Sequence, residues 1–284
     1  MVRARLKVDP RPRRHFGIGF KLTELDELLR TRQNQVQLLG GLYWLSDGLY
    51  WLELDGAIVP QAHPDWVNQY PEYEHPAGIE YLVLRFFADI GEALDCWLNP
   101  LPLELADAVH RGAWTPWQLA LHAFLDRLPE NAPPESPDLW QAGQTAERWW
   151  RVRGLDTAYL RAAPKFTVLS TDAEHLELTW DTRQQRIEGV LVMVQSHGKV
   201  GLTRQEFMEA VYDFRGQLVA ALTKRIQDVQ TRGLVDVQQA MKLRLQLETW
   251  LNDFDADLNR TPDEDWPETI NAIRTLEPLI GPLF

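Results

Sequence analysis

The stretch GLYWLSDGLYWLELDG, residues 41–56, decides how the first part of the chain folds, because GLYWL occurs in it twice, seven residues apart. Apolar runs at 42–45 and 49–54 flank Asp47-Gly48, a dipeptide typical of tight hairpin turns. Asp55-Gly56 repeats that signal before a further short apolar run. The stretch therefore predicts a three-stranded antiparallel meander.

The meander raises the question of whether its Trp side chains are buried or displayed. Alternate residues of a strand point to opposite faces, so Trp51 faces one way while Tyr50 and Leu52 face the other. Both faces of this strand are largely apolar, which is typical of a strand covered on both sides. We therefore expect Trp51 to be buried.

The rest of the chain alternates between helical and extended patterns. Apolar spacing and capping signals predict helices at residues 79–98, 103–109, 115–128, 139–153, 203–232, 236–257 and from 261 onward, and β-branched or alternating runs predict strands at 166–169, 175–180, 187–194 and 200–202. The fold class predicted is α+β, with two small antiparallel sheets, each followed by helices, and a helical C-terminal region.

Composition suggests how these elements are grouped. A chain of 284 residues suits one large or two small domains, and its twelve Trp supply a large apolar area. We expect a basic flexible leader over residues 1–21, an N-terminal hairpin-plus-helices part over 22–129 and a C-terminal sheet-and-helices part over 139–284. The proline-rich segment between the two parts resembles a linker, although both parts are free to pack as one domain.

Charge is distributed unevenly along the chain. The formal net charge is −12, yet residues 1–21 carry seven Lys and Arg against one Asp, so the remainder carries −18. An acidic body repels phosphate, which argues against general nucleic-acid binding, and it attracts a protein with a basic surface. The chain shows neither a signal-peptide pattern nor an apolar run that would span a membrane, and its single cysteine, Cys96, excludes an internal disulfide. These features predict a cytoplasmic protein, and they leave its oligomeric state open.

Motifs for catalysis or cofactor binding are absent from the sequence. The patterns GxSxG, GxGxxG, GxxxxGK[ST], HExxH and CxxC do not occur, so no cofactor and no catalytic residue is predicted. His63 and His75 flank a loop that contains Asp65, and these histidines are weak candidates for metal ligands. The loop matches no metal-binding spacing, so ordinary loop residues are the preferred interpretation.

The densest candidate for recognition is ERWWRVRGLDTAYLRAAP, residues 147–164. Trp and Arg are enriched at interface anchors, and the alternative is an internal network in which Asp156 pairs with Arg153 or Arg148. The predicted binding residues, taken together with those of the opening stretch, are Asp47, Trp51, Trp149, Trp150, Arg151, Arg153, Asp156, Tyr159 and Arg161.

Three segments of the chain resemble a family of uncharacterised bacterial proteins, a domain of unknown function. They are LSDGLYWLELDG, RWWRVRGLDTAYLRAAP and VLVMVQSHGKVGLTRQEFMEAVYDF, and the resemblance extends over residues 41–225. It implies a bacterial cytosolic protein and no particular activity. The shared positions are Asp47, Tyr50, Trp51, Asp156, Thr157 and Tyr159.

Two functions follow as hypotheses. The first is a non-catalytic protein that binds another protein, for example an immunity protein or antitoxin that caps a basic toxin. The alternative is an enzyme of unfamiliar type that acts on a small anionic substrate, with the loop from His63 to His75 and the Arg-rich segment as an anion clamp.

Overall fold

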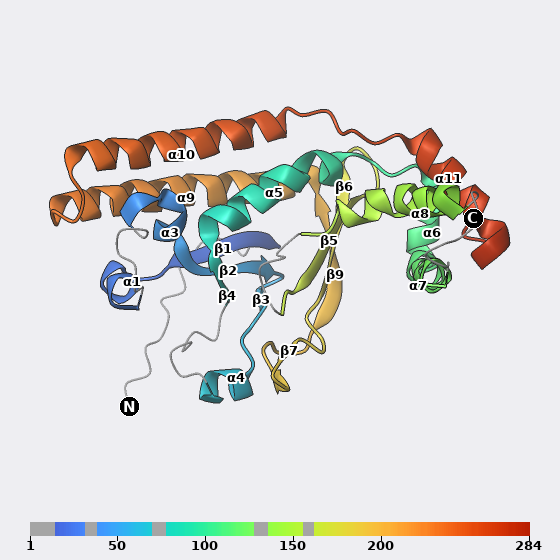
Figure 1. Cartoon of the computed structure of the whole chain (residues 1–284), viewed down its shortest axis with the longest axis horizontal. Helices are drawn as coiled ribbons and strands as arrows, with labels where there is room; N and C mark the ends of the chain where they lie inside the picture. The colour runs from blue at the N-terminus through green and yellow to red at the C-terminus, as the bar shows by residue number, and fades with distance from the viewer. Residues whose placement is uncertain (1–14, 32–38, 70–77, 128–135, 156–161) are drawn as a thin grey trace.

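In the computed structural model the described residues form two larger antiparallel sheets, covered on one side by long helices, and a separate two-stranded ribbon (Figure 1). The structure describes residues 15–31, 39–69, 78–127, 136–155 and 162–284. The α+β class predicted from the sequence is confirmed. In chain order the elements are β1 (Phe16–Leu22), α1 (Leu25–Thr31), α3 (Leu42–Leu45), β2 (Asp47–Leu54), β3 (Ala57–Val59), α4 (Pro64–Gln69), β4 (Ile79–Leu82), α5 (Val83–Leu98), α6 (Leu103–His110), α7 (Trp114–Leu125), α8 (Ser136–Arg151), β5 (Lys165–Ser170), β6 (His175–Asp181), β7 (Arg186–Ile187), β8 (Val190–Leu191), β9 (His197–Thr203), α9 (Arg204–Thr231), α10 (Val237–Leu258) and α11 (Trp266–Ile280).

The first sheet is built around β2, which pairs with β1 along one edge and with β3 and β4 along the other. The predicted turn at Asp55-Gly56 is confirmed, since both residues have the positive φ angles (49° and 81°) that such a tight hairpin requires. The hairpin fixes the register of β2 against β3, with Leu52 opposite Val59.

The other predicted hairpin is wrong. Residues 42–45 form the short helix α3, and Asp47-Gly48 lies inside β2, with Gly48 opposite Leu22 of β1. Glycine is needed here for close approach, because a Cβ at Gly48 would lie 2.3 Å from the carbonyl oxygen of Lys21. A dipeptide that usually marks a turn therefore marks a tight contact between strands.

The partner strand β1 comes from the segment that was expected to be a flexible leader. Its seven residues alternate between inward and outward positions and pair with the whole of β2, from Phe16 opposite Leu54 to Leu22 opposite Gly48. The predicted leader over residues 1–21 is therefore too long, and its residues 1–14 lie outside the described part of the chain.

The predicted helix at 79–98 begins four residues later than expected. Residues 79–82 pair with β2 as strand β4, and α5 starts at Val83. Ser46, which is distant in the sequence, satisfies the first turn of α5. Its carbonyl accepts from the amide of Val83 (2.9 Å) and its hydroxyl from that of Leu84 (3.2 Å). Local periodicity does not reveal such a cap.

The second sheet has three strands in the order β5-β6-β9, one fewer than predicted. The run at 187–194 does not join it, and part of that run forms the separate two-stranded ribbon β7-β8 instead. Positive φ at Glu188 (51°) and Gly189 (84°) forms the turn of this ribbon. The chain then returns in β9 and enters α9 through the predicted capping box, in which Thr203 and Glu206 bond to each other's backbone amides.

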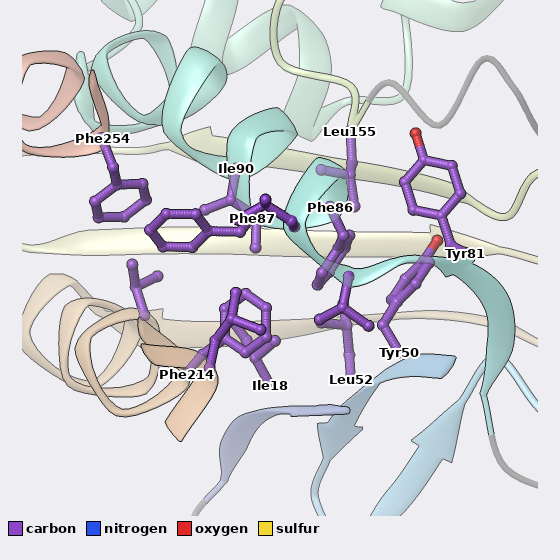
Figure 2. Packing of buried hydrophobic residues seen from close by; sticks show 14 of the residues in the cluster. Ile18, Tyr50, Leu52, Tyr81, Phe86, Phe87, Ile90, Leu155, Phe214 and Phe254 are labelled. Atoms are coloured by element: carbon purple, nitrogen blue, oxygen red, sulfur yellow. The ribbon is translucent and has the colours of Figure 1, made fainter. Parts of the chain in front are cut away.

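The main hydrophobic cluster lies between the helices α5, α9 and α10 and the two larger sheets, since β5, β6 and β9 also contribute residues to it. Figure 2 shows Phe86 and Phe87 of α5 entering this space, with Phe214 of α9 and Phe254 of α10 beside them. Phe87 stacks on Phe254 with ring centroids 4.2 Å apart, and Phe86 stacks on Tyr50 at 3.8 Å. Each such buried side chain contributes roughly 1.5–3 kcal/mol through removal of apolar surface from water.

A second cluster, rich in Trp, is formed by α6, α7, α8 and α11. Trp114 and Trp149 lie at its centre, with ring centroids 4.6 Å apart. Both clusters draw residues from either side of the proline-rich segment 130–138, so the hydrophobic cores do not divide the chain at that segment.

Candidate functional site

The outer face of the first sheet carries Trp51, a partly exposed residue of the opening stretch. Tyr50, Leu52 and Leu54 point into the main cluster, whereas Trp51 is partly exposed and Glu53 is exposed. The expectation that Trp51 is buried is therefore wrong. The helices α5 and α9 cover the opposite face of this sheet, so the strand is covered on one side and its alternation divides core from surface.

Two glycines hold the indole of Trp51 flat against the sheet. A Cβ at Gly19, the residue opposite Trp51 on β1, would lie 2.2 Å from the indole Nε1. A Cβ at Gly78 would lie 3.2 Å from the indole Cε3, and Gly78 also has a φ of 90° that favours glycine. The ring therefore lies across the backbone at places where a side chain is missing.

Charged side chains surround this ring. The indole N–H of Trp51 donates to Oε1 of Glu53 at 3.2 Å, and Gly17 lies opposite Glu53 on β1. On the other side of the ring, Lys21 and Glu80 lie opposite Leu49 on the two neighbouring strands. Within the described part of the chain, no Lys or Arg side chain forms an ion pair with Glu53. This arrangement offers an aromatic surface next to an unneutralised carboxylate.

Asp47 is the first residue of β2 and has a structural role. It is 6% exposed, and its carbonyl oxygen accepts a hydrogen bond from the amide of Thr23 at 2.9 Å. Beside it the Arg225 guanidinium donates to the carbonyl oxygens of Leu45 (3.2 Å) and Thr23 (2.6 Å). Burial lowers the pKa of Arg225, and the negative charge of Glu24, Asp228 and Asp47 opposes that effect. Because Asp47 is buried, we assign it to positioning β2 rather than to partner contact.

Arg153, predicted to contact a partner, is fully buried and belongs to an internal network. Its guanidinium binds both carboxylate oxygens of Glu264, with 2.8 Å between Nη2 and Oε2, and donates to the carbonyl of Trp149 at 2.9 Å. It also lies 5.2 Å from the centroid of the Trp266 ring. The internal alternative from the sequence holds for Arg153. Its carboxylate partner is Glu264, which is distant in the sequence, and Asp156 lies outside the described residues.

The other members of the Arg-rich segment are placed differently. Trp149 is buried in the Trp-rich cluster, Trp150 is half-buried against it, and Arg151 is exposed at the end of α8. Tyr159 and Arg161 lie outside the described residues. Figure 1 places α8 and β2 well apart along the long axis of the molecule, so the part of this segment that lies in α8 is not next to Trp51.

Among the residues that the structure describes, none joins His63 in a metal site. The Nδ1 atom of His63 accepts a hydrogen bond from the backbone amide of Asp65 at 3.2 Å, which fixes the local turn, and His75 lies outside the described residues. Across the described ranges, no group of three or more His, Cys, Asp and Glu residues is arranged to hold a metal ion. No described helix combines the length and apolarity that a membrane crossing requires.

Sequence reasoning missed the partners that shape these sites. Gly19 and Gly78 define the flat indole, yet the sequence prediction places Gly19 in the flexible leader and Gly78 just before the helix at 79–98. The His122–Glu147 pair was also missed, in which Nε2 lies 2.5 Å from the carboxylate oxygen of a buried glutamate. The pair joins α7 to α8, so the residue spacing within either helix does not reveal it. The repeated glycines of FGIGF, residues 16–20, were the available signal for a bare strand face.

Comparison with known proteins places the chain in a family. Residues 17–272 match the family model DUF5984, a family of unknown function. The chain belongs to the DUF5984 family. This confirms the resemblance to an uncharacterised domain, and the matched region of DUF5984 includes both sheets and the Trp51 face. Neither the curated proteins nor the solved structures contain a match.

Proposed function

We propose that this DUF5984 protein is a non-catalytic binding protein of the bacterial cytoplasm, and that its partner is a protein with a basic surface. In its most specific form it is an immunity protein or antitoxin that neutralises a toxin by covering a basic active site. The observation that carries this proposal is the surplus of negative charge, 41 Asp and Glu against 29 Lys and Arg.

The ion pairs support this proposal because they neutralise many of the cations locally. Arginines on different elements each bind a nearby carboxylate, which leaves the remaining acids to set the field around the molecule. The pairs are Arg85–Asp89, Arg183–Asp181, Arg215–Asp255, Arg232–Asp26, Arg260–Asp95 and Arg274–Glu104.

The region between α5 and α10 illustrates the local surplus. Burial raises the pKa of Asp257, the Arg260 guanidinium opposes that effect, and the carboxylates of Glu92, Asp95 and Asp253 raise the pKa further. These four acids lie near two arginines, Arg260 and Arg85, the second of which lies 3.7 Å from Glu92, so negative charge is in excess here. A basic partner would relieve the repulsion, and its association would be steered by the same field.

The enzyme alternative has less support. An anion clamp needs arginines whose guanidinium groups are free to bind a substrate, and Arg153 is enclosed with Glu264. Arg148 pairs at the surface with Asp263 at 3.3 Å. Arg151 is exposed at the end of α8, but one such arginine does not form a clamp, so we prefer the binding protein.

The experiment is capture of the endogenous complex from the source bacterium, followed by native mass spectrometry and identification of the bound protein. We expect one dominant partner of high isoelectric point, whose complex weakens steadily as NaCl is raised from about 0.05 to 0.5 M, because salt screens exposed charges. In the toxin form of the proposal, a neighbouring gene encodes the partner and co-expression restores growth. Absence of a stable basic partner under low salt would contradict the proposal.

The charge dependence has a matched control. Replacing Asp253 by Lys reverses a charge in the acidic region between α5 and α10, whereas Glu188→Lys reverses one at the exposed β7-β8 turn. We expect the first change to slow association several-fold more than the second, because steering acts where the partner approaches. Equal effects of the two would argue that this region is not where the partner binds.

A further inference from the structure

The Trp51 face presents an indole ring beside the carboxylate of Glu53, and this pair of groups favours a particular class of ligand. We propose that Trp51 and Glu53 form a site for a guanidinium group, in which an arginine side chain of the basic partner stacks on the indole and pairs with the carboxylate. The choice of a protein as the source of that arginine rests on the proposed function, whereas the chemistry of the site rests on its geometry.

The indole is prepared for stacking before any ligand arrives. Because Gly19 and Gly78 lack side chains, the ring rests against the backbone, over Gly19 of β1 and beside Gly78, the residue before β4. Trp51 is nevertheless partly exposed. A ring that is held flat loses little rotamer freedom on binding, which favours its use as a recognition surface.

The carboxylate of Glu53 makes the site next to the indole negative, so the site suits a cationic ligand. Its Oε1 accepts the indole N–H at 3.2 Å, while its Oε2 accepts no hydrogen bond from any described residue. Across the ring, Lys21 and Glu80 balance each other in formal charge. Among the described residues that flank the ring on β1, β2 and β4, the net negative charge therefore comes from Glu53, and it repels an anionic ligand.

Arginine satisfies this arrangement better than the other cationic side chain. Its planar guanidinium stacks on an aromatic face and presents paired N–H donors to a carboxylate in the same plane, whereas a Lys ammonium is a compact and strongly hydrated charge. An uncharged flat or cyclic ligand would also stack on Trp51, but it would gain little from Glu53. Sensitivity to Glu53 therefore separates a cation site from a general aromatic one.

The test uses the full chain and two labelled, capped peptides, one of alternating Arg and Gly and one of alternating Lys and Gly, with fluorescence anisotropy as the readout. We expect the Arg peptide to bind more tightly. Trp51→Leu and Glu53→Gln should each weaken it by about three- to thirtyfold, equivalent to about 0.7–2 kcal/mol at 1.4 kcal/mol per factor of ten.

The matched controls replace residues of the same type elsewhere. Trp140→Leu removes a Trp that is 52% exposed on α8, and Glu248→Gln neutralises an exposed acid on α10. Both should leave binding of the Arg peptide within about twofold. Thermal unfolding of each variant checks that the fold is retained, and Glu53→Gln, at an exposed position, is the variant that stays informative should Trp51→Leu fail to fold.

A further variant tests the flat ring itself. In Gly19→Ala the new methyl group would occupy the place of the indole Nε1, so the ring must move off the sheet while both site residues remain. We expect a loss of Arg-peptide binding comparable to that of Trp51→Leu. Equal binding of the Arg and Lys peptides, or unchanged binding in Glu53→Gln, would overturn the proposal.

The outcome can be separated from that of the proposed function. If the endogenous basic partner binds wild type and the Trp51→Leu/Glu53→Gln double variant equally, the site is refuted while the binding function stands. If the Arg peptide depends on Trp51 and Glu53 but no protein partner is captured, the site stands and the proposed function fails.

Discussion

Arg153 is a single residue that joins three parts of the chain. From the end of α8 it reaches Glu264 before α11, the carbonyl of Asn99 after α5 and the indole of Trp266. Its own carbonyl oxygen accepts a hydrogen bond from the indole N–H of Trp97 at 3.0 Å. A charge taken out of water in this way is tolerated because an opposite charge and several acceptors surround it.

Removing the partner charge should therefore be costly. We expect Glu264→Gln to lower the free energy of unfolding by about 3–5 kcal/mol, because it leaves the enclosed guanidinium uncompensated. Asp263→Asn is the matched control, since its carboxylate is 98% exposed and its pair with Arg148 contributes at most about 1 kcal/mol. Urea denaturation followed by circular dichroism measures both. A loss below about 1 kcal/mol in Glu264→Gln would contradict the assigned role.

Cys96 lies close to the same network and should be unreactive. Burial and the negative charge of Glu264 and Asp95 raise the pKa of the Cys96 thiol to about 12, while Arg153 opposes them. At pH 8 we expect alkylation by iodoacetamide to be at least about a thousandfold slower in the native protein than in urea, where an ordinary thiol pKa of about 8.5 returns. Intact-mass spectrometry follows the reaction, and rapid labelling of the native protein would refute this.

The same shift has a consequence for stability. The folded protein keeps the Cys96 thiol protonated, so its contribution to stability is complete below about pH 8.5 and is lost as the pH rises toward about 12. A plot of unfolding midpoint against pH in this alkaline range should therefore fall less steeply in Cys96→Ala.

At the scale of elements, α10 has two faces of different character. Leu243 is fully buried against α9 and α5, whereas Leu245, two residues later, is 62% exposed. Met241 is 55% exposed on the same outer side as Leu245. The identical residue type therefore serves as core on one side of this helix and as surface on the other.

This contrast gives a matched pair of substitutions. Leu243→Ala should destabilise the protein by about 2–5 kcal/mol, because it removes apolar contacts and leaves a cavity. Leu245→Ala should change stability by no more than about 0.5 kcal/mol. Chemical denaturation of both variants provides the measurement, and comparable losses would show that the outer face of α10 is covered in solution.

The helix boundaries show where local sequence signals are sufficient and where tertiary contacts decide. The helices α9 and α10 begin and end at their caps, with Thr203 and Asp236 as N-caps, and these boundaries agree with the sequence prediction. The helix α11 does not begin at Thr261, because Asp265 takes the N-cap and accepts from the amide of Glu268. Several acids in a row offer equivalent caps, and packing of Trp266 on the Trp-rich cluster selects among them.

At the scale of the whole molecule, α11 completes the Trp-rich cluster. It contributes Ile273 and Leu276, both fully buried, while the carbonyl of Gly281 just beyond it accepts the indole N–H of Trp117 at 3.0 Å. The helix packs on α8 and α7, which come from the middle of the chain. The hydrophobic packing of α6, α7 and α8 therefore depends on α11, which follows them by more than 100 residues in the sequence.

Removal of residues 266–284 should therefore disrupt one cluster more than the other. We expect near-ultraviolet circular dichroism from the Trp residues to fall substantially and binding of a hydrophobic dye to rise, while the far-ultraviolet signal of α9 and α10 is largely kept. Leu279→Ala, at a position that is 49% exposed in α11, serves as the control and should behave as wild type. An unchanged near-ultraviolet spectrum in the truncated chain would contradict this role of α11.

The sequence by itself determined the α+β class, the capping box at Thr203, the apolar stripe of α9, the Asp55-Gly56 hairpin and the surplus of acid. These properties depend on neighbours within a few residues or on composition, which a sequence displays directly. Tertiary structure alone decided that β1 is the partner of β2, that Ser46 caps α5, that Arg153 pairs with Glu264 and that Trp51 lies flat against Gly19. Each of these joins residues that are distant in the chain, and the close approach is fixed by packing of the whole core rather than by local preference.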